Sequence, residues 1–157
     1  MRRLLGRPLV ASIVALVASS GVVRAANNCL TGEFIDRRGE AELVIANDDP
    51  LQPHRYRPRC ATVSEGTRII FRAMPNFGSH PLYGGTVSGG VATIDPDSPI
   101  GSANSGTEVQ RMLVESGEFP FFCDFHYQMG MMGSIRVVPE LFRDGFENAP
   151  GDVRAGR

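Results

Sequence analysis

Apolar and polar residues alternate in short runs along most of the chain, beginning near residue 42 and ending near residue 138. Runs of this kind, with a period of two and with Gly, Pro, Asp and Ser between them, are typical of β-strands joined by turns. The sequence contains no internal repeat and no long amphipathic helical pattern. The pattern therefore predicts an all-β sandwich.

Residues 84–106 are the exception to this alternation. They are rich in Gly, Ser, Asp and Pro and show little periodicity, so we expect a long loop or a loosely paired excursion there. The strands expected elsewhere are residues 42–46, 60–63, 67–73, 108–114, the Phe-rich segment ending at 123, and a last strand that Pro139 terminates.

The N-terminal stretch has a different pattern. A basic segment at residues 2–7 precedes an apolar run from Leu9 to Val23, which is short for a membrane span. Small residues before position 26 complete the pattern of a secretory signal peptide. We predict that residues 1–25 are this signal peptide, cleaved after Ala25; an uncleaved membrane anchor is the alternative.

The remaining chain is long enough for one domain, which we place at residues 26–139, with residues 140–157 as a flexible tail. Residues 1–25 hold four of the 16 basic residues and none of the 17 acidic ones. The mature chain would then have 12 basic and 17 acidic residues, a formal charge of −5. This balance argues against nucleic acid as a partner and is compatible with a basic or neutral protein. After cleavage we expect no stable membrane insertion.

Candidate metal ligands lie between the last two predicted strands. Cys123, His126 and Met131 have the spacing Cys-x2-His-x4-Met and would share one loop. Thiolate, imidazole and thioether are the soft and borderline ligands expected for copper that cycles between Cu(I) and Cu(II). A trigonal site with two His, one Cys and a weak axial Met needs a second His, and His80 can supply it.

In these features the sequence resembles the cupredoxins, specifically the plastocyanin, pseudoazurin and amicyanin group of small blue copper proteins. The resemblance covers residues 41–138 and is carried by Tyr56-Arg57-Pro58, the segment 63–71, His80 and the Cys123 loop. It implies a Greek-key β-sandwich with one copper ion held in loops at one end. The implied ligands are His80, Cys123, His126 and Met131.

The resemblance also implies a function. We expect a type 1 copper protein that shuttles single electrons, is not an enzyme, and meets its redox partners transiently near His126 as a monomer. The alternative is a copper storage or delivery protein, which the thioethers of Met129, Met131 and Met132 support. The whole chain has three His, too few for a multicopper oxidase or a copper nitrite reductase. With a signal peptide, such a protein would be periplasmic or secreted.

Several assignments have alternatives. Met129 gives the shorter spacing found in amicyanin and could replace Met131 as the axial ligand. His54 has no motif around it, and we expect a surface residue. If Cys123 is a ligand, Cys29 and Cys60 remain as a pair, for which we predict a disulfide; a metal-ligand role for either is the alternative.

Two residues next to the predicted ligands differ from those found in many cupredoxins. Many cupredoxins have Asn after the first His, with its backbone N–H directed at the thiolate, whereas this chain has Pro81, which lacks an N–H. Many also have Pro just before the second His, where this chain has Phe125. We hypothesise that the Phe125 amide donates to the Cys123 sulfur in place of the missing donor.

Overall fold

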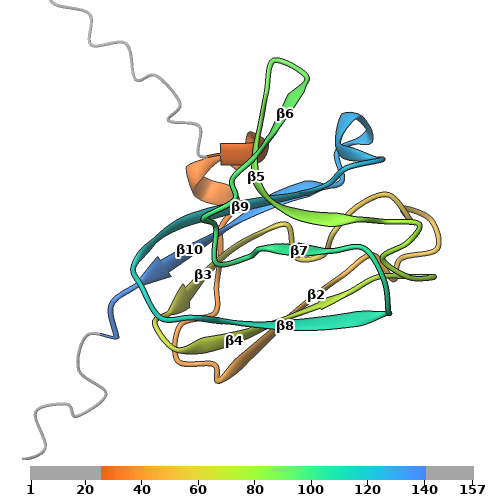
Figure 1. The fold of residues 1–157 in the computed structure, drawn as a ribbon. Coiled ribbons are helices and arrows are strands. Elements are labelled where there is room, and N and C mark those ends of the chain that lie inside the picture. Colours follow the sequence, from red (N-terminus) through yellow and green to blue (C-terminus); the bar gives the residue numbers. More distant parts are fainter. Residues whose placement is uncertain (1–25, 141–157) are drawn as a thin grey trace, which may run out of the picture.

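The computed structural model of the protein describes residues 26–140, so the predicted signal peptide and nearly all of the predicted tail lie outside the described residues. Two β-sheets pack face to face (Figure 1), which confirms the predicted all-β sandwich. The larger sheet has the order β1-β3-β10-β9-β5-β6, with β7 paired to β5, and the smaller has the order β2-β4-β8. The strands are β1 (Ile35–Asp36), β2 (Glu42–Ala46), β3 (Cys60–Ser64), β4 (Thr67–Arg72), β5 (Leu82–Ser88), β6 (Val91–Ile94), β7 (Ser102–Ala103), β8 (Glu108–Leu113), β9 (Gly117–Cys123) and β10 (Met132–Val138).

Helical structure in residues 26–140 is limited to three short 3-10 turns, η1 (Ala26–Asn28), η2 (Thr31–Glu33) and η3 (Tyr127–Met129). Over the same residues, none of the helices is both long and apolar enough to cross a membrane.

The core lies between the two sheets and is rich in aromatic side chains. The rings of Tyr56, Phe71 and Phe121 pack edge to face, with centroids 5.1 to 6.5 Å apart. Aromatic pairs in this geometry stabilise a core beyond the area that they bury. The alternation in β4 points Phe71 inward and Arg72 outward, as the sequence pattern predicts.

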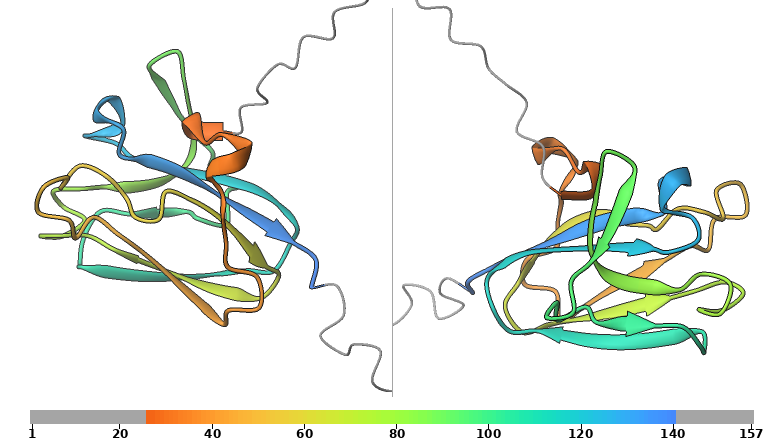
Figure 2. Two further views of the ribbon diagram at one scale, coloured as in Figure 1. Left: turned by 180° about the vertical axis from the view of Figure 1, so that it is seen from behind. Right: turned by 45° about the horizontal axis from the view of Figure 1, so that its top comes forward.

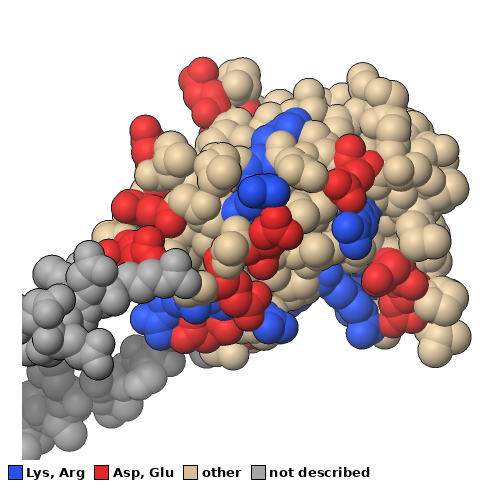
Figure 3. Space-filling model, turned by 90° about the horizontal axis from the view of Figure 1, so that it is seen from below, with Lys and Arg blue, Asp and Glu red and all other residues tan. Residues whose placement is uncertain are grey.

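On the outer face of the smaller sheet, charged residues pair across neighbouring strands. Arg68 of β4 contacts Glu42 of β2 at 2.8 Å, and Arg72 contacts Glu108 of β8 at 2.9 Å. Figure 3 shows that Arg and acidic side chains are intermixed on the face seen from below. Exposed pairs of this kind add little stability individually. Because both signs of charge are mixed, the face seen in Figure 3 is neither uniformly positive nor uniformly negative.

Of the two expectations for residues 84–106, the long loop is wrong for the first part, where the structure has a paired excursion. β5 and β6 form a hairpin around Gly89-Gly90, and β5 also pairs with β9 inside the larger sheet. Figure 2 shows this hairpin standing out from the sheet. Glycine is needed in β5 because a Cβ at Gly84 would lie 2.3 Å from Ser98 Oγ and one at Gly85 would lie 2.2 Å from the Thr93 carbonyl. Gly84 and Gly85 are therefore glycines because neighbouring segments pack too closely for a side chain. Their presence hides the strand pattern in the sequence.

The segment before β1 is tied to the larger sheet by one buried side chain. The Asn27 amide nitrogen lies within 2.7 to 3.1 Å of the carbonyl oxygens of Gly85, Phe121 and Gly133, which belong to β5, β9 and β10. The Val87 N–H donates to the Asn27 oxygen at 2.6 Å. A single asparagine thus links three strands.

The predicted disulfide is present. Cys29 is bonded to Cys60 at the start of β3, and both residues are buried. The bond joins positions 31 residues apart and fastens the N-terminal segment to the larger sheet.

Candidate metal centre

The loop that carries three of the predicted ligands is closed on itself by backbone hydrogen bonds. Cys123 ends β9, and its N–H donates to the Met131 carbonyl at 2.9 Å. The Met131 N–H in turn donates to the His126 carbonyl at 3.1 Å. Between them η3 turns the chain, and Gly130 takes the left-handed conformation (φ +92°) that favours glycine. The sequence therefore folds this loop so that Cys123, His126 and Met131 share a small space.

His80 reaches the same end of the sandwich from the connection between β4 and β5. Its N–H donates to the Asn76 carbonyl at 3.1 Å, and the Ser79 N–H donates to the Asn76 side chain at 3.0 Å. Phe77 is fully buried and anchors this turn in the core. Two separate connections between strands thus fix the two imidazoles.

The three ligand atoms converge. His80 Nδ1 and His126 Nδ1 are 3.1 Å apart, and the Cys123 sulfur lies 3.5 Å from His126 Nδ1 and 4.0 Å from His80 Nδ1. Metal–ligand bonds of about 2.0 Å to nitrogen and about 2.3 Å to sulfur, arranged in a trigonal plane, would give separations of about 3.5 to 3.7 Å. The observed triangle brackets these values, so a metal ion fits among the three atoms with small shifts.

The methionines on the loop differ in burial. Met131 is fully buried in the same core cluster as Cys123, whereas Met129 is 56% exposed. This difference favours Met131 over Met129 as the axial thioether, a role that stays a prediction. Met132 begins β10 and is buried.

Burial sets the protonation of these groups. The pKa values of His80 and His126 are lowered, first by burial and then by neighbouring imidazoles, which favours the neutral form that binds metals. Burial also raises the pKa of the Cys123 thiol, and backbone hydrogen bonds from Phe125 and His126 oppose that rise. The Phe125 amide thus acts on the Cys123 sulfur in the direction that the hypothesis requires, and its effect on a bound metal stays a prediction.

His54, which we expected at the surface, is half-buried and makes a ring contact that the sequence did not indicate. Its ring stacks on the His126 ring, with centroids 4.2 Å apart and planes 20° apart, and it lies 5.7 Å from the His80 ring. His54 belongs to the connection between β2 and β3, which no local motif links to the ligand loop. Only the folded topology brings them together.

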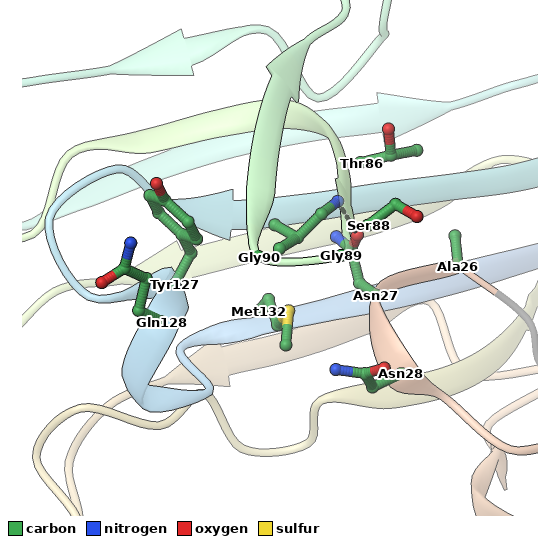
Figure 4. A pocket seen from close by; sticks show the side chains of 11 residues that line it. Ala26, Asn27, Asn28, Thr86, Ser88, Gly89, Gly90, Tyr127, Gln128 and Met132 are labelled. Atoms are coloured by element: carbon green, nitrogen blue, oxygen red, sulfur yellow. Dashed lines mark hydrogen bonds between the residues drawn. The ribbon is translucent and has the colours of Figure 1, made fainter.

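A separate pocket borders the ligand loop. Tyr127 and Gln128 line it together with η1 and the turn of the β5–β6 hairpin (Figure 4), and its volume is about 540 Å³. Asn27 lies in its wall, where its polar atoms are satisfied by the strands described above. The three metal-ligand side chains do not line this pocket, so it is distinct from the metal centre.

The two-sheet sandwich and the ligands at its end define the class of the molecule. The chain has a cupredoxin fold, and His80, Cys123 and His126 have the geometry of a type 1 copper site, with Met131 buried in the same core cluster as Cys123. The donor set fits copper because two imidazoles, one thiolate and a buried thioether are ligands that copper accepts in both oxidation states.

Known structures of similar fold include copper proteins. Auracyanin from Roseiflexus castenholzii matches at 17% identity and a TM-score of 0.45, over 64% of this chain and 98% of that one. Pseudoazurin from Methylobacterium extorquens AM1 matches at 19% identity and a TM-score of 0.44, over 66% and 79%. A Cu-containing nitrite reductase from Thermus scotoductus SA-01 matches at 17% identity and a TM-score of 0.42, over 64% of this chain but only 23% of the enzyme's length. No protein-family model and no curated protein matches the sequence.

Proposed function

We propose that this protein is an exported blue copper protein that carries single electrons between redox partners. The observation that carries the proposal is the convergence of His80 Nδ1, His126 Nδ1 and the Cys123 sulfur, held from two connections of one sandwich. Bound copper would supply a one-electron Cu(I)/Cu(II) couple at this position.

The protein's own contribution is to keep the ligands still. Cys123 is fixed by strand pairing with Leu82, by its hydrogen bond to Met131 and by complete burial. His80 is fixed by its turn, which the buried Phe77 anchors. Because the geometry is set by the sandwich, little needs to move when the charge at the site changes, and this favours rapid electron exchange over substrate chemistry.

The surface around the site supports transient docking. Phe125 is 63% exposed and Met129 is 56% exposed, and both neighbour the half-buried His126 on one loop. A small apolar area beside a redox centre suits the weak interfaces of electron-transfer encounters. We propose that partners dock here and that the protein acts as a monomer.

Export is supported by two features of the described residues. The Cys29–Cys60 disulfide is typical of oxidising compartments such as the periplasm. In addition, the Ala26 nitrogen lies 2.8 Å from a carboxylate oxygen of Glu118. Cleavage after Ala25 would create an ammonium group at this nitrogen, next to a carboxylate that can receive it.

Copper storage or delivery is the second candidate, because Met129 and Met74 expose their thioethers. Two measurements on the copper-loaded protein separate the candidates. A carrier should give a reversible one-electron voltammetric wave and retain copper against a competing chelator in both oxidation states. Rapid loss of Cu(I) to the chelator without a reversible wave would favour delivery and contradict the carrier.

A further inference from the structure

Three aromatic rings surround the His126 imidazole. His54 is the nearest and the most parallel, with centroids 4.2 Å apart and planes 20° apart. The His80 ring is 4.7 Å away at 42°, and the Phe125 ring is 6.4 Å away at 74°. The shortest of these ring contacts therefore joins His126, a predicted ligand, to His54, which is not one.

The loop that carries His54 is held in place by hydrogen bonds from a buried side chain. The fully buried Asn47 donates from its side-chain amide to the carbonyl of Pro53, the residue before His54, at 2.9 Å. The same amide donates to the Met74 carbonyl at 2.9 Å, and the Met74 N–H donates to the Asn47 oxygen at 2.8 Å. Asn47 thus joins the loop of His54 to the connection that leads to His80.

The far side of this loop is also fastened. Arg57 pairs with Asp49 at 2.8 Å, and its backbone forms two hydrogen bonds with Ala46 at the end of β2. These contacts lie on both sides of His54 in the sequence, so the fold fixes the backbone from which its ring projects.

His54 does not act as a ligand in this arrangement. Within residues 26–140, the cluster of possible ligand atoms within 4.8 Å of one another consists of His80, Cys123 and His126. A ring that lies nearly parallel to a ligand ring directs its nitrogens alongside that ligand's nitrogens, which suits stacking better than sharing one ion.

We propose that His54 is a positioning residue, which holds the His126 ring by stacking and thereby limits its rotation away from the metal. This inference rests on the proposed function and adds a residue to it. His126 has the more exposed of the two ligand imidazoles, since His80 is buried and His126 is half-buried. It is therefore the ligand that most needs support from outside the metal bonds.

The test compares His54→Ala, which removes the ring, with His54→Phe, which keeps a ring but no nitrogen. Stacked aromatic pairs are worth enough to speed chelator-driven copper loss about two- to tenfold in His54→Ala. His54→Phe should stay within about twofold of the parent protein. Leu51→Ala is the matched control, because Leu51 lies in the same loop and is 89% exposed.

NMR of the metal-free protein gives a second readout that does not need copper. The stacked His54 ring shields the His126 ring protons, so those resonances should move downfield in His54→Ala and remain shielded in His54→Phe. Thermal unfolding checks that each variant is folded. The proposal is overturned if His54→Ala changes neither copper loss nor the His126 resonances, or if His54→Phe behaves like His54→Ala. Failure of the parent protein to bind copper would instead count against the proposed function, and the NMR comparison would still decide the stacking.

Discussion

At the scale of single residues, the axial position depends on which methionine reaches the metal. Met131 is buried beside Cys123 and Met129 is more than half exposed. We therefore expect Met131→Leu to keep copper but change its colour and reduction potential, while Met129→Leu changes neither. Visible spectra and voltammetry of the two variants check this, and the reverse result would move the axial role to Met129.

The Phe125 amide is the second residue-scale feature. A hydrogen bond from this amide opposes the rise in the Cys123 pKa, and at a bound copper it would reduce electron donation to Cu(II) and so favour Cu(I). Phe125→Pro removes this donor, and Pro81→Asn adds the N–H that this chain lacks. If the bond changes the relative stability of the two oxidation states by about 1 kcal/mol, the potential shifts by roughly 40 mV. We expect a lower potential in Phe125→Pro and a higher one in Pro81→Asn; an unchanged or higher potential in Phe125→Pro contradicts the role of this amide.

Tyr56 carries a polar atom that the described fold leaves unpaired. Its hydroxyl is buried without a hydrogen-bond partner among residues 26–140, and burial raises its pKa well above the usual value. Because an unsatisfied buried hydroxyl costs about 1 to 3 kcal/mol, Tyr56→Phe should leave the free energy of unfolding of the metal-free protein unchanged or raise it. A denaturant titration measures this, and a clear loss of stability would mean that the hydroxyl has a partner in solution.

At the scale of elements, the N-terminal segment connects export to the fold. We expect mature protein from the periplasm to begin at Ala26, as intact-mass measurement would show. Its ammonium group should pair with the partly buried Glu118, which also contacts Ser134 and Arg136. Glu118→Gln should lower the free energy of unfolding by about 0.5 to 1 kcal/mol.

A chain with one extra residue before Ala26 is the matched control for that prediction. The added residue moves the positive charge away from Glu118, so Glu118→Gln should then have a smaller effect. An equal effect in both chains, or a mature protein that starts elsewhere, would count against the pairing.

The sequence predicts best those strands in which the alternation of apolar and polar residues matches the buried and exposed faces of the sheet. β2, β4 and β10 follow the alternation of apolar residues, and Pro139 marks the end of β10. The β5–β6 hairpin is hard to predict because two of its glycines, Gly84 and Gly85, lie within a strand and are needed for close contacts with Ser98 and Thr93, whereas Gly89-Gly90 form its turn. Such contacts exist only in the folded chain, so composition alone indicates a loop.

The same limit applies to the site. Cys123, His126 and Met131 are close together in the sequence, so their spacing alone predicts a shared site. His80 was assigned because of the resemblance to cupredoxins. His54 and Asn27 act through contacts with distant segments, and their neighbours in the sequence carry no signal for these roles.

At the scale of the whole molecule, the two sheets give the loops at one end a fixed frame. The disulfide and Asn27 fasten the N-terminal segment to the larger sheet, and Asn47 joins two loops beside the metal centre. This frame, the buried Cys123 and the exposed apolar residues near His126 agree with the electron carrier proposed above. The pocket beside η3 is lined by residues other than His80, Cys123 and His126.

The visible absorption of the purified protein loaded with one equivalent of Cu(II) tests the central claim most directly. Coordination by the Cys123 thiolate in a trigonal site predicts an intense blue colour that disappears on reduction and returns on oxidation. Cys123→Ser, which keeps both imidazoles but removes the sulfur, should be colourless at the same copper loading. A parent protein without this absorption, or a Cys123→Ser variant that stays blue, would contradict the assignment of a type 1 copper centre.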